Sequence, residues 1–361
     1  MRRNNLLAFK YISLHYLKYF FIILVALEMF LVGFDYMQYA DQLTKSANLL
    51  LIYLVYKSFY GIDMLLPLSL IFAMISTKIM LIRSNALVSF YSLGYTRVDV
   101  LRPFVVVSTI ITIIYIGLHS FSSFARANEF SDNIRSYSQY LSSSRDLFFT
   151  YKGKYIYFAE MIPLQEKAKG IRVFSVEDNS LKEVLIAKEA NYRNGFWNIK
   201  SADIITKPEK LDFESLGIRV DEEYNLDILK GFRPKILDQV YEGKVNFTIR
   251  NAIDAVILLQ DQNIDTSSIK GALYKIFIYP FFVPCLVVII FFFVPVSVRF
   301  LNVSIFSFIA ILSTLMVWGI LFMLVELSIN KTLASEVGII LPIVVLFLIA
   351  FRQYRHYRFT T

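Results

Sequence analysis

Residues 125–146, ARANEFSDNIRSYSQYLSSSRD, begin a polar segment around which the rest of the chain is organised. This segment continues to about residue 270 and separates two strongly apolar halves. Residues 126–270 hold 21 Lys+Arg and 22 Asp+Glu, a net charge of −1. Because the whole chain carries +8, the two flanks together carry +9, so the basic excess lies beside the apolar runs. We predict a polar domain at residues 125–270, inserted between hydrophobic halves at residues 1–124 and 271–361.

The composition is typical of a multispanning membrane protein. Of the 361 residues, 56% are hydrophobic, and the mean hydropathy is +0.54. Six apolar runs are each close to the ~20 residues that a helix needs to cross a bilayer. These runs are Tyr19–Tyr36, Ile62–Ile82, Pro103–Ser123, Ile276–Val298, Ile305–Ser328 and Leu333–Phe351. The predicted fold is therefore a polytopic α-helical membrane protein with three spans on each side of the insert.

The charges beside the spans predict an orientation. Basic residues precede span one, separate spans two and three and spans four and five, and follow span six. They are Arg2, Arg3, Lys10, Arg83, Arg97, Arg102, Arg299, Arg352, Arg355 and Arg358. Under the positive-inside rule these segments and both termini are cytoplasmic, which places the insert outside. No small-residue cleavage site follows the first apolar run, so we expect a retained span and not a signal peptide.

Several function classes are excluded by what the sequence lacks. The pI of about 9.2 does not indicate nucleic acid, because the basic residues flank apolar runs and form no separate basic face. Cys285 is the single cysteine, and only three histidines occur, so no cysteine zinc site or clustered metal set is expected. No phosphate-binding G-x-x-x-x-G-K-[ST] loop is present. We expect no cofactor, and ATP-driven work would need ATP to be bound by a partner subunit.

The insert has the pattern of β structure. Two pairs of predicted strands flank short turn clusters, and Asn194-Gly195 suits a type I′ turn. The strands are Leu147–Tyr151 with Tyr155–Ala159, Ile171–Val176 with Val184–Ala187, and Phe196–Ile205. Their spacing predicts a sandwich or a jellyroll-like domain. After Pro234, apolar residues recur at helical spacing and indicate a helix that returns to the membrane; they are Ala252, Ala255, Val256 and Leu259.

Six spans with a β insert after the third resemble the LptF/LptG lipopolysaccharide export permeases. The run Arg83-Ser84-Asn85-Ala86-Leu87-Val88, followed by Gly94-Tyr95-Thr96-Arg97, is similar to the family's cytoplasmic segment between spans two and three. Asp41-Gln42-Leu43 looks more like LptG than LptF. Tyr274-Lys275-Ile276-Phe277 with Pro280 resembles the family's entry into span four.

The resemblance implies a function. Such a chain would be a permease subunit of an ABC transporter in the inner membrane. It would extract lipopolysaccharide from the outer leaflet and pass it to a periplasmic bridge. Its implied partners are an LptF-like permease, an LptB-like ATPase dimer, LptC-like and LptA-like bridge proteins, and membrane lipid, but no nucleic acid.

The resemblance also implies residues that meet the substrate. These are Glu28, Phe34, Gln38, Asp41, Gln42, Lys45, Arg135 and Glu326. Glu28 and Glu326 would lie at a gate between spans one and five, or would simply be hydrogen-bonded carboxyls in helix packing. Gln38 stands where LptG proteins can carry a lysine, which leaves Lys45 as the nearby cation. The polar cluster after span one also fits an ordinary solvated loop, and Arg135 has the same two interpretations.

Residues 84–98 form the candidate coupling helix. Leu87, Phe90, Tyr91 and Gly94 would share one apolar face. The pattern alone fits an interfacial helix on lipid headgroups, whereas the resemblance implies contact with the ATPase. The implied coupling residues are Arg83, Ser84, Asn85, Ala86, Leu87, Phe90, Tyr91, Gly94, Tyr95 and Arg97.

A second function class remains open at the level of sequence. A membrane-embedded transferase acting on lipid would use Glu28, or an acidic residue of the insert, as its acid or base. The sequence shows no clustered catalytic constellation for such an enzyme. Co-purification of an ATPase would separate the two functions.

Overall fold

We describe the protein from a computed structural model. The structure describes residues 2–43, 47–135, 144–151, 153–162, 166–177, 180–208, 217–230, 248–250, 252–253, 256, 267–293 and 302–359. The chain divides into a helical unit, Met1–Ser136 with Lys270–Thr361, and a second unit, Tyr137–Ile269. Each unit is described by itself.

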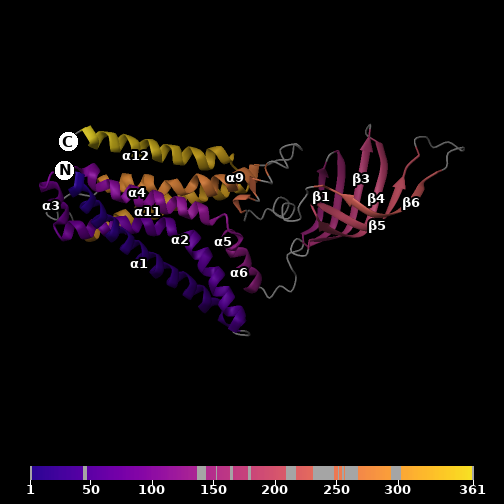
Figure 1. The fold of residues 1–361 in the computed structure, drawn as a ribbon, viewed down its shortest axis with the longest axis horizontal. Coiled ribbons are helices and arrows are strands. Elements are labelled where there is room, and N and C mark those ends of the chain that lie inside the picture. Colours follow the sequence, from indigo (N-terminus) through magenta and orange to yellow (C-terminus); the bar gives the residue numbers. More distant parts are fainter. Residues whose placement is uncertain are drawn as a thin grey trace. The chain divides into compact units, whose positions relative to one another are not determined.

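Six helices of the helical unit are long and apolar enough to cross a membrane, as the sequence predicts. The first three are α1 (Arg2–Leu43), α2 (Ala47–Arg83) and α4 (Arg97–Leu118). The fourth span combines α9 (Ser267–Phe277), η1 (Tyr279–Phe281) and α10 (Phe282–Phe293). The fifth is α11 (Val303–Ile329), and the sixth is η3 (Glu336–Ile340) with α12 (Leu341–Phe359). The first turns of α1 and the last turns of α12 lie at the same end of this unit (Figure 1).

The first two helices are longer than the apolar runs. Residues 37–61 are predicted as an outer connection, but α1 continues to Leu43 and α2 begins at Ala47. The segment after Ala47 is rich in Leu, Ile and Tyr, and its few polar residues lower the hydropathy without breaking a helix. Lys57 and Gln38 therefore lie on helices and not in a solvated loop.

Spans three, four and six also depart from the predicted straight helices. Span four is interrupted at Ile278, just before Pro280, which lacks the N–H that would continue the helix. Span six begins with the π-helical turn Glu336–Ile340, and α12 runs to Phe359, eight residues past the predicted end at Phe351. The predicted third span ends early, at Leu118, and is followed by α5 (Ser122–Ala125) and α6 (Ala127–Arg135).

The helix α2 lies at the centre of the helical unit. It contacts α1, α6, α10 and α11, and most of its residues from Leu66 to Lys78 are buried. In contrast, α1, α11 and α12 carry many exposed apolar side chains, among them Phe30, Phe308 and Phe347. These helices therefore form the outer surfaces of the unit. Their exposed apolar side chains suit contact with lipid or with another membrane protein.

Between α2 and α4 lies the short helix α3 (Ala86–Ser92). The predicted helix over residues 84–98 is too long. Asn85 adopts a left-handed conformation (φ 56°) before α3, and Gly94 (φ 86°) reverses the chain after it. Thr96 then caps α4 through a capping box with Asp99.

The second unit is a six-stranded antiparallel sheet. The strands are β1 (Ser144–Tyr151), β2 (Lys154–Ile162), β3 (Lys167–Glu177), β4 (Ser180–Arg193), β5 (Phe196–Thr206) and β6 (Arg219–Ile228). Both predicted strand pairs are confirmed, and so is the predicted turn between β4 and β5, in which Asn194 and Gly195 have positive φ. The strands lie in chain order, so the described residues form one meander, without the interleaved strand order of a jelly roll.

One face of the sheet is apolar. A row of aligned residues, Phe158, Ile171, Ala187 and Ala202, crosses from β2 to β5 and is buried throughout. The Trp197 indole, also fully buried, lies 5.2 Å from the Phe158 ring. Of the predicted return helix, Ala252 and Val256 are helical, whereas Ala255 and Leu259 lie outside the described residues.

Candidate functional site

The predicted substrate residues of α1 divide between a buried position and an exposed one. Glu28 lies against Gly61 of α2, where a Cβ would collide with the carboxylate. Both carboxylate oxygens are buried and have no hydrogen-bond partner among the described residues. Phe34 is 64% exposed and stacks on Phe30, with ring centroids 6.3 Å apart. A carboxyl of this kind in an apolar setting is costly, which marks Glu28 as a functional candidate.

The C-terminal end of α1 carries the predicted polar cluster. Gln38 is exposed, and Asp41 and Gln42 are in the last turn of α1, although their side chains lie outside the described residues, as does Lys45. Arg135, at the end of α6, lies 4.5 Å from the Tyr39 ring centroid and pairs with Asp132 at 3.1 Å. The fold thus places Arg135 beside the helix turn that holds Gln38.

Sequence reasoning missed an ion pair in the same region. Lys57 Nζ lies 2.9 Å from Asp35 Oδ1, and the Tyr53 hydroxyl donates to Asp35 Oδ2. The lysine side chain is only 9% exposed. Lys57 is 22 residues after Asp35, and only the return of α2 along α1 brings them together. This pair joins the C-terminal part of α1 to the N-terminal part of α2.

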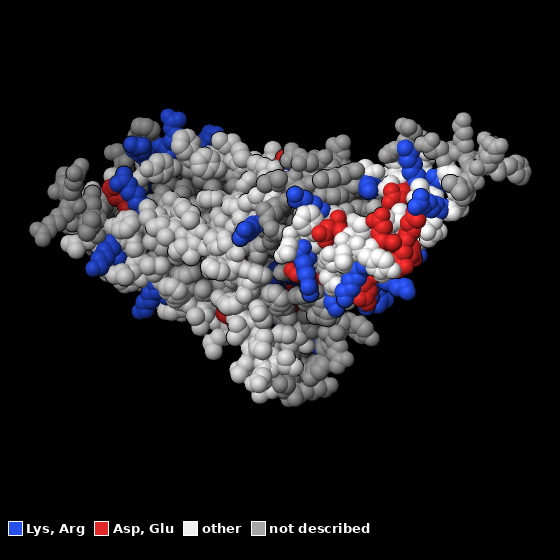
Figure 2. All heavy atoms as spheres, turned by 45° about the vertical axis from the view of Figure 1, so that its right-hand side comes forward, with Lys and Arg blue, Asp and Glu red and all other residues white. Residues whose placement is uncertain are grey.

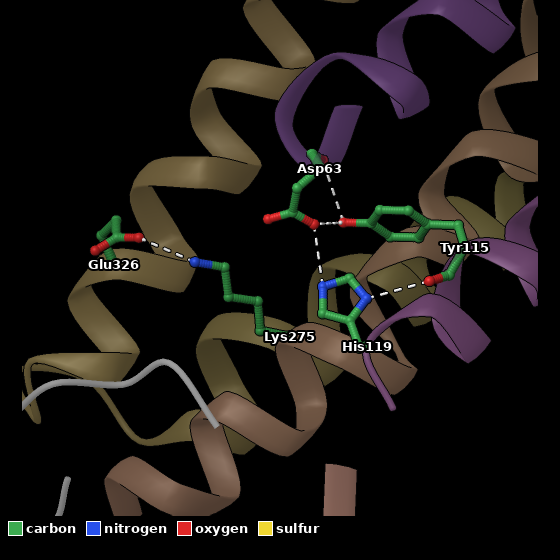
Figure 3. Close-up of polar contacts among 5 residues, drawn as sticks. All are labelled: Asp63, Tyr115, His119, Lys275 and Glu326. Carbon is green, nitrogen blue, oxygen red and sulfur yellow. Dashed lines mark hydrogen bonds and ion pairs between the residues drawn. The ribbon is translucent and has the colours of Figure 1, made fainter. Parts of the chain in front are cut away.

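A second polar network lies where α4 ends (Figure 3). Asp63 Oδ1 accepts a hydrogen bond from the Tyr115 hydroxyl (2.8 Å) and lies 3.0 Å from His119 Nε2. His119 Nδ1 lies 3.1 Å from the Tyr115 carbonyl oxygen. Lys275, from α9, pairs with Glu326 of α11 at 3.5 Å, and both side chains are 42% exposed. The two groups of contacts connect α2 to α4 and α9 to α11.

The structure does not pair the two acids predicted for a gate within this chain. Glu28 packs against α2, whereas Glu326 pairs with Lys275 of α9. A gate that uses both would need α1 or α11 to face a second permease.

The coupling segment contains α3, which lies at the opposite end of the helical unit from α5, the short helix that follows α4 (Figure 1). Leu87 is fully buried, so it anchors α3 and does not belong to an exposed face. The Phe90 ring lies 6.1 Å from the Tyr11 ring and 5.7 Å from the Tyr95 ring. Burial raises the pKa of the Tyr91 phenol to about 12, so this hydroxyl stays neutral.

A groove of about 1070 Å³ opens beside α3. Predicted coupling residues form one wall: Ser84, Ala86, Phe90, Gly94 and Tyr95. The first turns of α1 form the other wall, with Leu7, Lys10, Tyr11 and Leu14. Sequence reasoning missed this contribution of α1, although Lys10 and Tyr11 precede the apolar run at the correct end.

The other predicted coupling residues do not line this groove. Arg83 and Asn85 are exposed, and the Arg97 guanidinium lies 5.4 Å from the Tyr357 ring centroid. Leu93, which was not predicted, is 75% exposed and lines the groove. Within the described residues no group of His, Cys, Asp and Glu could hold a metal ion.

Comparison with protein families matches residues 10–356 to the family described as "Lipopolysaccharide export system permease LptF/LptG". The chain belongs to this family. It is therefore a multi-pass membrane protein and the transmembrane component of the lipopolysaccharide export ABC transporter, whose ATPase is a separate subunit. This settles the choice against a membrane-embedded transferase. Comparison with individual curated proteins gave no match.

Proposed function

We propose that this chain is the LptG-like half of the permease and pairs with an LptF-like chain. The motif Asp41-Gln42-Leu43 at the end of α1 supports this choice. An LptB-like ATPase dimer would drive the pair, and LptC-like and LptA-like proteins would accept the lipid. The chain would take lipopolysaccharide from the outer leaflet of the inner membrane.

Orientation is the first part of the proposal. Arg83, Arg97 and Arg102 lie at the α3 end, and the exposed Arg352, Arg355 and Arg358 lie in the last turns of α12. Lys and Arg side chains gather at one end of the helical unit beside a broad uncharged surface (Figure 2). The positive-inside rule then places both termini in the cytoplasm and the sheet in the periplasm.

Single cysteines test this orientation in a Cys285→Ser background. An Asn194→Cys variant should react with an impermeant thiol reagent in intact spheroplasts, whereas a Thr361→Cys variant should react only after lysis. The reverse pattern at either position overturns the orientation.

Lipid entry is the second part. Both α1 and α11 present long exposed apolar surfaces, on α1 around Phe34 and Met37 and on α11 around Met316 and Met323. We place the entry gate where these surfaces meet the partner permease. Glu28 would lie behind this surface, and Gln38 and Arg135 would meet phosphate or sugar at the outer end of α1.

Energy coupling is the third part. The groove between α3 and the start of α1 is open, lies at the basic end, and is lined by aromatic side chains such as Phe90 and Tyr11. Aromatic anchors in such grooves commonly dominate protein–protein affinity. Closure of the ATPase dimer on ATP would push on α3, and the buried Leu87 would transmit the force to α2.

Lipid transfer through the sheet is the last part. A periplasmic bridge built by strand pairing needs a free sheet edge. Among the described strands the edges are β1 and β6, whereas β3 has β2 and β4 on its two sides. Photo-crosslinkers along β1 or β6 should therefore give adducts with a bridge protein at alternate positions, and β3 should give none.

The groove at α3 is the observation that best supports the proposal. A permease without its own ATP site needs a contact with the ATPase through which force is transmitted. Purification in mild detergent tests it. We expect a nucleotide-binding subunit and a second, different permease chain of this family to co-purify. If the chain is isolated with neither, the assignment fails.

A further inference from the structure

A second groove lies on a different surface of the helical unit. It has a volume of about 650 Å³ and is formed by α4, by the broken span α9–α10 and by α12. Its walls are almost entirely apolar; they include Val106, Phe281, Cys285 and Phe347. The break at Ile278 opens one end of the groove, and Arg102 and Tyr354 lie at the other end.

The length of the groove matches one leaflet of a bilayer. On α12 its lining extends from Ile343 to Tyr354, which at ~1.5 Å per residue corresponds to about 16 Å. Half of a ~30 Å hydrocarbon core is about 15 Å. An acyl chain that follows the groove would therefore reach from the bilayer midplane to the interface, where Arg102 lies.

The mouth of the groove is basic and aromatic. Arg102 lines it with 62% of its side chain exposed, and Asp99, its ion-pair partner among the described residues, is 3.5 Å away. The Arg355 guanidinium lies 5.8 Å from the ring centroid of Phe351, which is also a lining residue. Basic pockets between membrane helices favour anionic lipid headgroups, and tyrosine suits the interface.

We propose that this groove binds an anionic phospholipid of the surrounding membrane. One acyl chain lies between α4, α10 and α12, and the phosphate contacts Arg102, with Arg355 beside it. A docked helix is a poorer occupant, because helix–helix contacts in membranes favour small residues, whereas these walls carry Val106, Phe281 and Phe347. The site is separate from the α1 and α11 surfaces assigned to the substrate, so it is a lipid site additional to the transport path.

Native mass spectrometry of the purified transporter complex tests the proposal. After delipidation, the complex is titrated with phosphatidylglycerol, cardiolipin or phosphatidylethanolamine. We expect a saturable adduct with the two anionic lipids only. Arg102→Gln should weaken it about fivefold, the effect of one interfacial arginine. Arg352→Gln is the matched control, because Arg352 is an exposed arginine of α12, which also forms a wall of the groove, but is not a lining residue, and it should leave the adduct unchanged.

A second variant tests whether the lipid needs the groove itself and not only the positive charge of Arg102. Val106→Trp keeps Arg102 but fills the groove, and it should abolish the saturable adduct while subunit composition and thermal unfolding stay normal. A photoactivatable phosphatidylglycerol should label peptides of α10 and α12 in the wild type and not in this variant.

Three outcomes would overturn the proposal. In the first, Arg102→Gln and Val106→Trp bind the anionic lipids as well as the wild type does. In the second, inorganic phosphate alone displaces the adduct, which would show a free-anion site. In the third, lipopolysaccharide displaces the adduct at equal concentration, which would make the groove a substrate site.

Discussion

Charged residues are paired differently at the two ends of the helical unit. At the end where α4 finishes, acids and bases from different helices pair: Lys57 with Asp35 at 2.9 Å, His119 with Asp63 at 3.0 Å, and Lys275 with Glu326 at 3.5 Å. At the α3 end the charges are mostly basic and lie beside aromatic rings, as Arg97 does beside Tyr357. One end therefore holds the helices together, and the other is the surface that we propose for partners.

The largest effect should come from the partner surface. Phe90→Asp places a charge in the groove beside α3, and loss of an aromatic anchor costs ~2 kcal/mol or more, or about thirtyfold in affinity. We expect the ATPase to be lost on purification while the chain stays in the membrane. Tyr91 does not line the groove but is half-buried, so Tyr91→Asp should act in the same direction by disturbing the packing of α3. Ser92→Asp is the control, because Ser92 is exposed on the same helix but does not line the groove. If the Phe90→Asp complex keeps its full ATPase complement, α3 is a membrane-surface helix.

The contact between Glu28 and Gly61 should give the next largest effect. Gly61→Ala inserts a methyl group against the Glu28 carboxylate, and because the end of this flexible side chain can move aside, we expect the low end of the overpacking cost, about 1 kcal/mol. Gly33→Ala is the control, because a Cβ there meets nothing within 4 Å. The thermal unfolding temperature in detergent should fall for Gly61→Ala and should not fall for Gly33→Ala. Adding Glu28→Ala to Gly61→Ala should restore the thermal stability. If it does not, the two residues are not in the proposed contact.

Changes to the network of Asp63, Tyr115 and His119 should have a smaller effect on stability. Tyr115→Phe removes one hydrogen bond to Asp63, which in membrane proteins is worth about 0.6 kcal/mol on average. Asp63→Asn weakens the same hydrogen bond, so the double variant should lose less stability than the sum of the two single variants. A double-mutant cycle on thermal unfolding measures this coupling, and strictly additive effects would mean that the two side chains do not interact.

The exposed pair should have the smallest effect. Lys275 and Glu326 are both 42% exposed and 3.5 Å apart, and exposed ion pairs contribute only about 0–1 kcal/mol. Lys275→Gln should therefore leave thermal unfolding almost unchanged. Because Glu326 is a proposed gate residue, lipid release is the informative measurement for this variant. A large stability loss would show that this pair belongs with the buried networks.

The sequence predicts what depends on local pattern. The six spans follow from hydropathy, and the hairpins follow from turn residues such as Asn194 and Gly195. The Lys57–Asp35 pair could not be predicted, because it depends on α1 and α2 extending beyond their apolar runs. The role of Leu87 was also hidden, since helical spacing defines an apolar face without saying whether that face is inward or outward.

One measurement tests the central claim, that ATP hydrolysis at the α3 end drives lipopolysaccharide onto the sheet. A photo-crosslinking residue is placed at Leu185, which is 8% exposed on the apolar face of β4, or at the neighbouring Ile186, which is 37% exposed on the other face. The complex is reconstituted with lipopolysaccharide and given ATP. We predict lipid adducts at Leu185 only with ATP, few at Ile186, and none at either position in the Phe90→Asp variant. Equal adducts at Leu185 with and without ATP would contradict the account.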